Sequence, residues 1–315
     1  MRVLILGGSG FIGSALARAL VGRGHAVRIS TRGQSRGGKE ATGASLTQVH
    51  WDGSTGAELA SLMEGMDVVI NLLGENIAAH RWTKAQKFRI RHSRIVAGEA
   101  VSQAFLLCKA AGNALPHTLV QASASGYYGV WAEANDAPCC TEDSPAGEGF
   151  LAETCVAWEA STKAVESLGV RRCVLRTAPV FGLHGGMLCR MLPFFRAGVG
   201  GVLGSGLQPM SWIHLHDAVA AILFLLENTA LAGVFNISSP YPVTMREGMM
   251  TLAKTLHRPA FVRVPAFVLE WILGAMAREL ILTGQKAVPT RLRAAGFTFD
   301  YPRMDGALAQ IVYQG

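Results

Sequence analysis

The sequence is poor in charge and has no long hydrophobic run. Only 16% of its 315 residues are charged, against 50% hydrophobic residues. Ordinary domains carry about 25% charged residues, so this composition excludes an intrinsically disordered chain. The longest apolar run, Ala218 to Leu226, is far shorter than the about 20 residues of a membrane span. The N-terminus lacks the pattern of a signal peptide, because Val3 to Leu6 leads directly into Gly7. We expect a soluble cytoplasmic protein that does not bind a membrane.

Clustered charge and cysteine motifs are missing as well. The net charge is +7, but the basic residues are scattered and no five-residue block of one sign occurs. A solvated face, or attraction for an anionic small molecule, explains this excess without nucleic-acid binding. The six cysteines form no CxxC motif and no Cys/His spacing typical of metal sites. We therefore expect reduced thiols and no metal.

Short apolar segments alternate with helical patterns over the first 176 residues. Strands that are apolar along their whole length, separated by helices, indicate a parallel sheet covered on both faces. The sequence therefore predicts a doubly wound α/β Rossmann sheet. The expected strands are 2–6, 26–30, 47–50, 67–72, 118–122 and 172–176. The expected helices start near Phe11 and cover 57–64, 83–111 and 150–167.

The pattern changes after about residue 180. Glycines cluster between 198 and 206, and a helix over 216–228 leads to a strand at 234–237. We divide the chain into a dinucleotide-binding domain, 1–180, and a smaller substrate lobe, 181–315. Parts of 207–238 are expected to complete the sheet, and a helical module is expected from about residue 265.

A glycine-rich motif directly follows the first strand and opens the first helix. The first glycine permits a tight turn, the second lets the backbone approach a pyrophosphate, and the third allows close packing of helix on strand. The free N–H groups of the helix then attract phosphate. This context predicts dinucleotide binding by the motif residues Gly7, Ser9, Gly10, Phe11, Ile12 and Gly13.

The end of the second strand favours NADP(H) over NAD(H). An acidic residue there would hold the ribose 2′-hydroxyl, whereas a basic residue suits the 2′-phosphate. The sequence has Thr31 and Arg32, with Arg36 close behind and no carboxylate. The alternative is that Arg32 is only a solvent-exposed side chain.

Several motifs together resemble the extended short-chain dehydrogenase/reductases of the NAD-dependent epimerase/dehydratase superfamily. More narrowly, the chain resembles an atypical subgroup labelled SulA-like cell-division inhibitors, which ends in a small helical domain. The segments that carry the resemblance are the glycine motif, Asn71–Gly74, Gly74–Ile77, Ser93–Arg94, Ser123–Gly129, Trp158–Glu159, Arg176–Gly182, Gly200–Gly206, Ser211–Asp217 and Gly284–Pro289.

The resemblance implies a Rossmann fold, a nicotinamide cofactor and specific residues around it. Asp52 and the run Leu72, Leu73, Gly74 would line the adenosine half, and Pro179 and Val180 would lie beside the nicotinamide. Asp52 can equally be a turn residue. Two polar residues after the fourth strand are substrate-binding candidates, because ligands bind at the carboxyl ends of such strands. These are Glu75 and Asn76.

The residues that usually transfer the proton are missing. Related dehydrogenases use a Tyr with a Lys four residues later, which lowers the pKa of the phenol. None of the five tyrosines has this lysine, and the spacing to Trp158 puts Leu151 and Cys155 at the two positions. The remaining candidate proton donors, which can equally be turn or packing residues, are Ser123, Ser125, Tyr127 and Tyr128.

Two functions remain open at this level. The first is an NADP-dependent oxidoreductase or epimerase that acts on a small carbonyl or sugar-like substrate. The second is a non-catalytic NADPH-binding sensor or partner-binding protein. A homodimer through helices 83–111 and 150–167 is an interpretation that core packing of the same apolar positions explains equally well.

Overall fold

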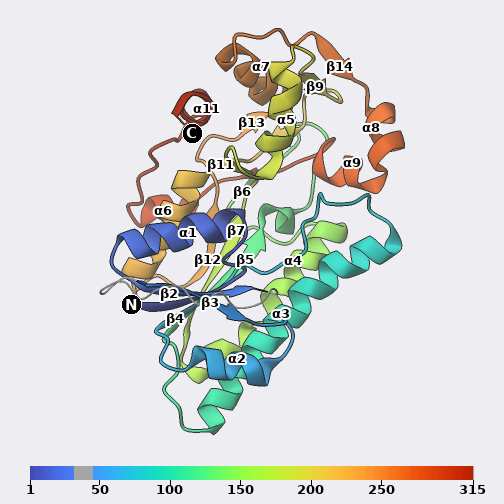
Figure 1. Ribbon diagram of the computed structural model, residues 1–315. Helices are drawn as coiled ribbons and strands as arrows, with labels where there is room; N and C mark the ends of the chain where they lie inside the picture. Colours follow the sequence, from blue (N-terminus) through green and yellow to red (C-terminus); the bar gives the residue numbers. More distant parts are fainter. Residues whose placement is uncertain (32–44, 315) are drawn as a thin grey trace.

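A computed structural model describes residues 1–31 and 45–314 of the chain (Figure 1). A seven-stranded sheet forms its centre, and all six pairs of neighbouring strands are parallel. The strand order is β12-β7-β5-β4-β1-β2-β3. In chain order the strands are β1 (Arg2–Leu6), β2 (Ala26–Thr31), β3 (Leu46–His50), β4 (Val68–Asn71), β5 (Thr118–Ala124), β7 (Arg171–Thr177) and β12 (Gly233–Ile237).

Helices cover both faces of the sheet, as the sequence predicts for strands that are apolar throughout. Val68, Val69 and Ile70 of β4 have no exposed surface, and their side chains alternate between the two faces. One face packs against α1 (Phe11–Gly22) and α6 (Leu215–Glu227). The other face packs against α2 (Gly56–Met63), α3 (Lys84–Ala110) and α4 (Phe150–Ala160). The doubly wound Rossmann architecture is confirmed.

The helix expected over 150–167 is shorter than predicted. It ends at Ala160, and a separate 3-10 helix, η2, covers Lys163–Leu168. Arg172 of β7 donates to the carbonyl of Glu159 at 3.1 Å and to the hydroxyl of Thr162 at 3.3 Å. The guanidinium thus donates a hydrogen bond to a carbonyl of the last helical turn, where α4 ends.

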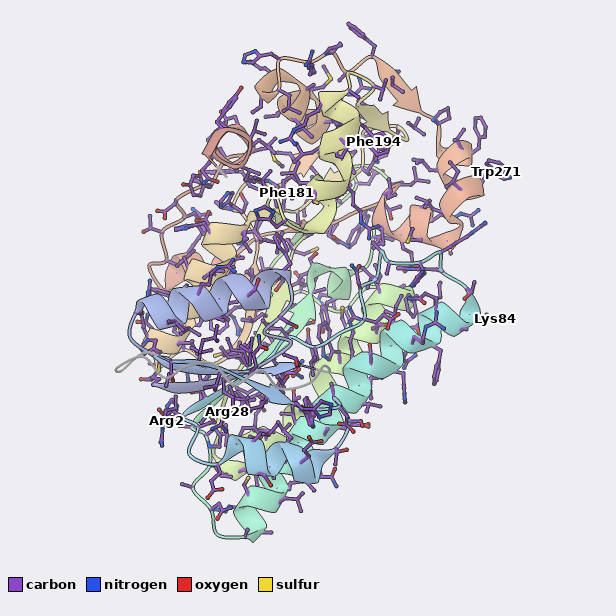
Figure 2. All side chains as sticks on the ribbon, in the orientation of Figure 1. Arg2, Arg28, Lys84, Phe181, Phe194 and Trp271 are labelled. Atoms are coloured by element: carbon purple, nitrogen blue, oxygen red, sulfur yellow. The ribbon has the colours of Figure 1, made fainter. Side chains whose placement is uncertain are left out.

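A second hydrophobic core lies beyond the carboxyl ends of the strands (Figure 1). Phe181 and Trp212 are fully buried in it, whereas Phe194 of α5 is exposed (Figure 2). Its helices are α5 (Gly186–Arg196), α7 (Met245–Thr255) and α11 (Met304–Gln314). Helices α8 (Ala266–Leu273) and α9 (Ala275–Leu280) belong instead to a smaller cluster with Trp82 and Ile90, and Trp271 of α8 is exposed. Helix α10 (Thr290–Ala294) packs on β12. Short strands pair as β8 (Val180–Phe181) with β11 (Ile213–His214), β9 (Gly201–Leu203) with β14 (Val262–Val264), β10 (Pro209–Met210) with β13 (Val243–Thr244), and β6 (Cys139–Cys140) with β15 (Lys286–Ala287).

Within the described ranges, no helix combines the length and apolar character needed to cross a bilayer.

Candidate functional site

The glycine loop after β1 leaves the start of α1 open to a ligand. The backbone of Gly10 is extended, no side chain among residues 1–31 and 45–314 caps the helix, and its first turn has no acidic residue. The N–H of Gly10 donates to the Gly7 carbonyl at 3.0 Å, in a turn that gives Gly7 a φ of +80°. A Cβ on Gly13 would lie only 2.4 Å from the same carbonyl oxygen. The uncapped N–H groups form an anion site of the kind that binds phosphate.

The other motif residues lie around this turn. Ser9 and Gly10 are exposed, and Phe11 and Ile12 are partly buried. The ring of Phe11 lies against the segment after β8, where a Cβ on Gly185 would lie 2.5 Å from the ring. The loop therefore contacts the segment that leads into the second core.

The ends of β2 and β3 lie on one side of the glycine loop. Thr31 ends β2, and its carbonyl accepts from the N–H of Trp51 at 3.1 Å. Arg32 and Arg36 lie outside the described residues. Asp52 is exposed and accepts four hydrogen bonds from Ser54 and Thr55, at 2.7 to 2.9 Å. Hydrogen bonds from Thr55 and Ser54 hold the pKa of Asp52 well below its usual range. This geometry is that of a turn residue, and contact with the cofactor stays a prediction.

The segment after β4 touches the glycine loop directly. A Cβ on Gly7 would lie 3.2 Å from the carbonyl of Leu72. The buried Asn71 shapes this segment, because its side chain donates to Gln121 at 3.0 Å and accepts from the N–H of Leu73 at 3.2 Å. Leu72 and Leu73 are partly buried, and Gly74 is exposed. The structure thus brings the first and fourth strand ends together, at the point where the strand order reverses.

Glu75 and Asn76 continue this segment toward the second lobe. The Glu75 carboxylate accepts from Gln86 at 3.1 Å and lies 3.8 Å from the guanidinium of Arg89. Asn76 is exposed, and its side-chain oxygen accepts from the N–H of Ala78 at 2.9 Å. The next contact crosses between the lobes, since Arg190 of α5 donates to the Ala78 carbonyl at 2.6 Å.

The two candidate serines lie at the end of β5 and are both hydrogen-bonded. The Ser123 hydroxyl donates to the carboxylate of Glu159 at 2.7 Å. The Ser125 hydroxyl, in the 3-10 helix η1 (Ser125–Tyr128), donates to Gln285 at 3.4 Å. Both serines are buried.

The two candidate tyrosines differ in their surroundings. Tyr128 is buried, donates to Asn236 at 2.6 Å and accepts from Arg176 at 3.2 Å. Burial raises the pKa of Tyr128 to about 12, despite the opposing effect of Arg176. Tyr127 is partly buried, and its ring centroid lies 3.3 Å from the Arg176 guanidinium carbon. Within the described part of the chain, Tyr127 is the one candidate whose hydroxyl makes no hydrogen bond to protein.

The positions of the missing pair are filled by uncharged side chains, of which Cys155 is buried and Leu151 partly buried. Cys155 lies on α4 beside Ser123 and Ala124, and burial raises the pKa of its thiol to about 11. Leu151 packs against the backbone of Gly126, where a Cβ would lie 3.2 Å from the leucine. A neutral thiol cannot provide the positive charge of a lysine.

Sequence reasoning missed the ion pair beneath these hydroxyls. Arg176 donates two hydrogen bonds to Glu159, and both side chains are largely buried. Burial opposes the charge of Arg176, but Glu159 outweighs it, so the pKa of Arg176 is raised. The available signal was an arginine at the end of an apolar strand, which burial permits only with a partner.

The β7 end completes this edge of the sheet. Pro179 is exposed, and its carbonyl accepts from the N–H of Ile213 at 3.0 Å. Val180 is buried and begins β8.

His214 and His216 lie at the start of α6. His214, rather than His216, caps α6, because its ring accepts from the N–H of His216 at 3.1 Å. Asp217 instead accepts from the N–H groups of Asp300 and Tyr301, both at 3.0 Å. Ligand atoms of His216, Asp217 and Asp300 lie within 4.8 Å of one another. These hydrogen bonds and the 2.7 Å contact of His216 with Asp300 account for the grouping.

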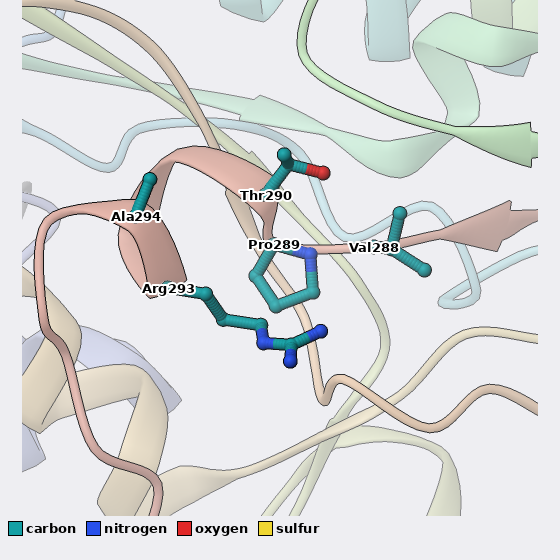
Figure 3. A pocket seen from close by; sticks show the side chains of 5 residues that line it. All are labelled: Val288, Pro289, Thr290, Arg293 and Ala294. Atoms are coloured by element: carbon teal, nitrogen blue, oxygen red, sulfur yellow. The ribbon is translucent and has the colours of Figure 1, made fainter.

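A pocket of about 410 Å³ lies at the start of α10 (Figure 3). Its lining is Val288, Pro289, Thr290, Arg293 and Ala294. None of these residues belongs to the strand-end site, and the lining contains no acid or reactive nucleophile.

The fold and the strand-end geometry define a dinucleotide-binding protein of the Rossmann class. The model of the NAD dependent epimerase/dehydratase family matches residues 3–238, and a domain of unknown function, DUF1731, matches residues 264–311. The chain belongs to the NAD-dependent epimerase/dehydratase family and carries this additional C-terminal domain.

Individual relatives match over almost the whole chain. It is 39% identical to the epimerase family protein MT2273 of Mycobacterium tuberculosis, over 97% of this chain and 96% of the relative. It is 37% identical to the epimerase family protein YfhF of Bacillus subtilis, over 99% and 98%. The crystal structure of the human epimerase family protein SDR39U1 with NADPH has a TM-score of 0.87 and 31% identity, and the match covers 100% of both chains.

Proposed function

We propose that the protein is an NADP(H)-binding oxidoreductase or epimerase that acts on a small carbonyl or sugar-like substrate without the usual Tyr–Lys pair. The uncapped start of α1, joined to the β4 end through Gly7 and Leu72, carries this proposal. The NADPH in the human relative, whose fold matches along the whole chain, supports the same cofactor. Bound NADP(H) supplies the hydride in such chemistry, and the protein orients the substrate and moves the proton.

The residues would hold the cofactor in three groups. The glycine loop would bind the pyrophosphate. The adenosine half would contact Thr31, Arg32, Arg36 and Asp52. The segments after β4 and β7 would contact the remaining parts of the cofactor. Titration with NADPH and NADH tests this arrangement. We expect tighter binding of NADPH, and a roughly tenfold to hundredfold loss for Arg32→Ala with NADPH only, since a charged hydrogen bond contributes about 1.5–3 kcal/mol. Equal affinities for both cofactors would remove the NADP assignment.

Tyr127 is the proton donor that the geometry favours. Its hydroxyl makes no hydrogen bond within the described residues, and Ser123, Ser125 and Tyr128 are each bonded to another side chain. The test is NADPH oxidation with a panel of carbonyl and nucleotide-sugar substrates. Turnover should fall in Tyr127→Phe while NADPH affinity is unchanged; undiminished turnover would exclude Tyr127.

The hydrogen bonding also supports the second function, a non-catalytic NADPH-binding sensor or partner-binding protein. Three of the four candidate hydroxyls serve the packing of the fold, and Tyr128 holds its proton to high pH. NADPH binding without turnover on the whole panel would favour this alternative.

We further propose that residues 181–315 form the substrate lobe above the strand ends, apart from helix α6, strand β12 and helix α10, which pack in or on the central sheet. Glu75 and Asn76 would contact the substrate there, beside the link from Ala78 to Arg190. We propose no role in cell division, although the sequence resembles a subgroup labelled SulA-like cell-division inhibitors.

A cytoplasmic location and a homodimer complete the proposal. All six cysteines are free thiols, as expected in a reducing compartment. Leu106 and Leu107 of α3 and Val156 of α4 are exposed and would lie in the interface, whereas Ala100 and Ala104 are buried in the core. Light scattering distinguishes dimer from monomer.

A further inference from the structure

Arg94 on α3 is a partly buried cation that binds no carboxylate of the described residues. Its Nη1 donates to the carbonyl of Ile90 at 2.8 Å, and its guanidinium carbon lies 4.9 Å from the centroid of the Trp158 ring. No other hydrogen bond from this guanidinium to a described residue is present. None of its nitrogens without a hydrogen-bond partner is fully buried, so the remaining N–H donors are accessible.

The free edge of this guanidinium lies against the end of β4. A Cβ on Gly74 would lie 3.0 Å from the Arg94 guanidinium carbon and 3.1 Å from Nη2. A side chain at position 74 would require the guanidinium to shift slightly. The glycine therefore lets the cation lie close against the backbone at the end of β4.

The surroundings of Arg94 are short of hydrogen-bond acceptors. The indole N–H of Trp158, whose ring the guanidinium covers, is buried without an acceptor in the described part of the chain. Burial lowers the pKa of Arg94, which the nearby Cys155 and Glu75 offset only in part. An oxygen-rich ligand would supply acceptors for the accessible donors of Arg94, and a guanidinium edge suits such ligands.

The order of the strands indicates which half of the cofactor reaches Arg94. The pyrophosphate site lies at β1, and β2 and β3, whose ends carry the expected adenosine contacts, lie on one side of it. Beyond β1 on the other side come β4 and then β5. Arg94 lies at this second side, between Gly74 after β4 and Trp158 on α4.

We propose that Arg94 binds oxygen atoms of the nicotinamide half of NADP(H), and that it is the cation of this half of the site. Cys155 stands at the position where the resemblance implies a lysine. Its thiol is neutral, so it does not provide the positive charge that a lysine would bring to the site. The inference rests on the proposed function, because it requires that the chain binds NADP(H).

The experiment compares the whole cofactor with a fragment that lacks the nicotinamide half. NADPH and adenosine 2′,5′-bisphosphate are titrated against the wild type, Arg94→Ala and Arg94→Lys. We expect Arg94→Ala to weaken NADPH binding roughly tenfold to hundredfold, the range for a charged hydrogen bond. Binding of the fragment should be unchanged, and Arg94→Lys should bind NADPH with intermediate affinity because it keeps the charge without the planar fork.

Arg91→Ala is the matched control, since Arg91 is on the same helix and its one ion pair with a described residue is the exposed contact with Glu153. It should bind both ligands like the wild type. Unchanged NADPH affinity in Arg94→Ala would overturn the inference, as would equal weakening of NADPH and fragment together with a lower melting temperature. A wild type that binds neither ligand would instead overturn the proposed function itself.

Discussion

Arg176 and Glu159 form a two-pronged ion pair beneath the strand ends, with N–O distances of 2.9 and 3.0 Å. The same carboxylate accepts from Ser123, and the ring of Tyr127 lies over the guanidinium. Tyr128 also accepts from Arg176, so one buried pair contacts three of the four candidate side chains. Its removal should affect stability and the geometry of the site together.

Glu159→Gln should lower the free energy of unfolding by about 3 kcal/mol, because it leaves a buried guanidinium without its counter-charge. Urea denaturation measures the loss. Glu153→Gln is the control, because Glu153 is on the same helix and lies 3.9 Å from Arg91 at the surface. That change should cost less than about 1 kcal/mol. Similar losses in the two variants would show that the buried pair contributes no more than a surface contact.

Tyr127→Phe and Tyr128→Phe should separate the two neighbouring phenols. Loss of the Tyr128 hydroxyl leaves the buried oxygen of Asn236 without its donor, which costs about 1–3 kcal/mol. Tyr127→Phe removes no hydrogen bond to a described residue and should leave stability unchanged. Thermal and urea unfolding of both variants check this. A larger loss for Tyr127→Phe would reveal a structural role for that hydroxyl.

The parts of the fold that depend on local sequence were predictable. A strand buried on both faces is apolar at every position, and the glycine loop occupies a few consecutive residues between β1 and α1. The bounds predicted for the strands agree with the structure to within two residues.

Contacts between distant residues were not predictable. Arg94 reaches Gly74, and Asp217 binds the backbone at Asp300, although 83 residues separate the last two. Neither partner carries a local pattern that points to the other. The role of Asp217 at the start of α6 was hidden for the same reason, since its partners are the backbone N–H groups of Asp300 and Tyr301.

Cys155 should react slowly with iodoacetamide, because burial raises the pKa of its thiol to about 11 and the thiolate is the reactive form. Cys139 and Cys189 are exposed and should be alkylated first. Mass spectrometry of the native protein at pH 8 resolves the order. Early modification of Cys155 would contradict the packing of α4 against β5.

Acid should destabilise the fold through His214, whose burial lowers its pKa to about 4. The unfolded chain gains this proton near pH 6.5 and the folded chain only near pH 4. The contribution of neutral His214 to the free energy of unfolding is therefore complete above pH 6.5, and it is lost as the pH falls toward 4. The loss is about 3 kcal/mol over that interval.

His214→Asn tests this point, because the asparagine oxygen can still cap α6. The free energy of unfolding of this variant should change less between pH 6.5 and 4 than that of the wild type. Parallel pH profiles would assign the acid sensitivity to other groups.

Strand β12 has a consequence for how the chain can be divided. It pairs with β7 from Gly233 to Ile237 and closes that side of the sheet, although about fifty residues of other structure intervene after Thr177. In a fragment that stops near residue 180, β7 would be an edge strand with unpaired backbone N–H and C=O groups, which could pair with other molecules. During synthesis from the N-terminus, the seven-stranded sheet can therefore be completed only after residue 237 has been added to the chain.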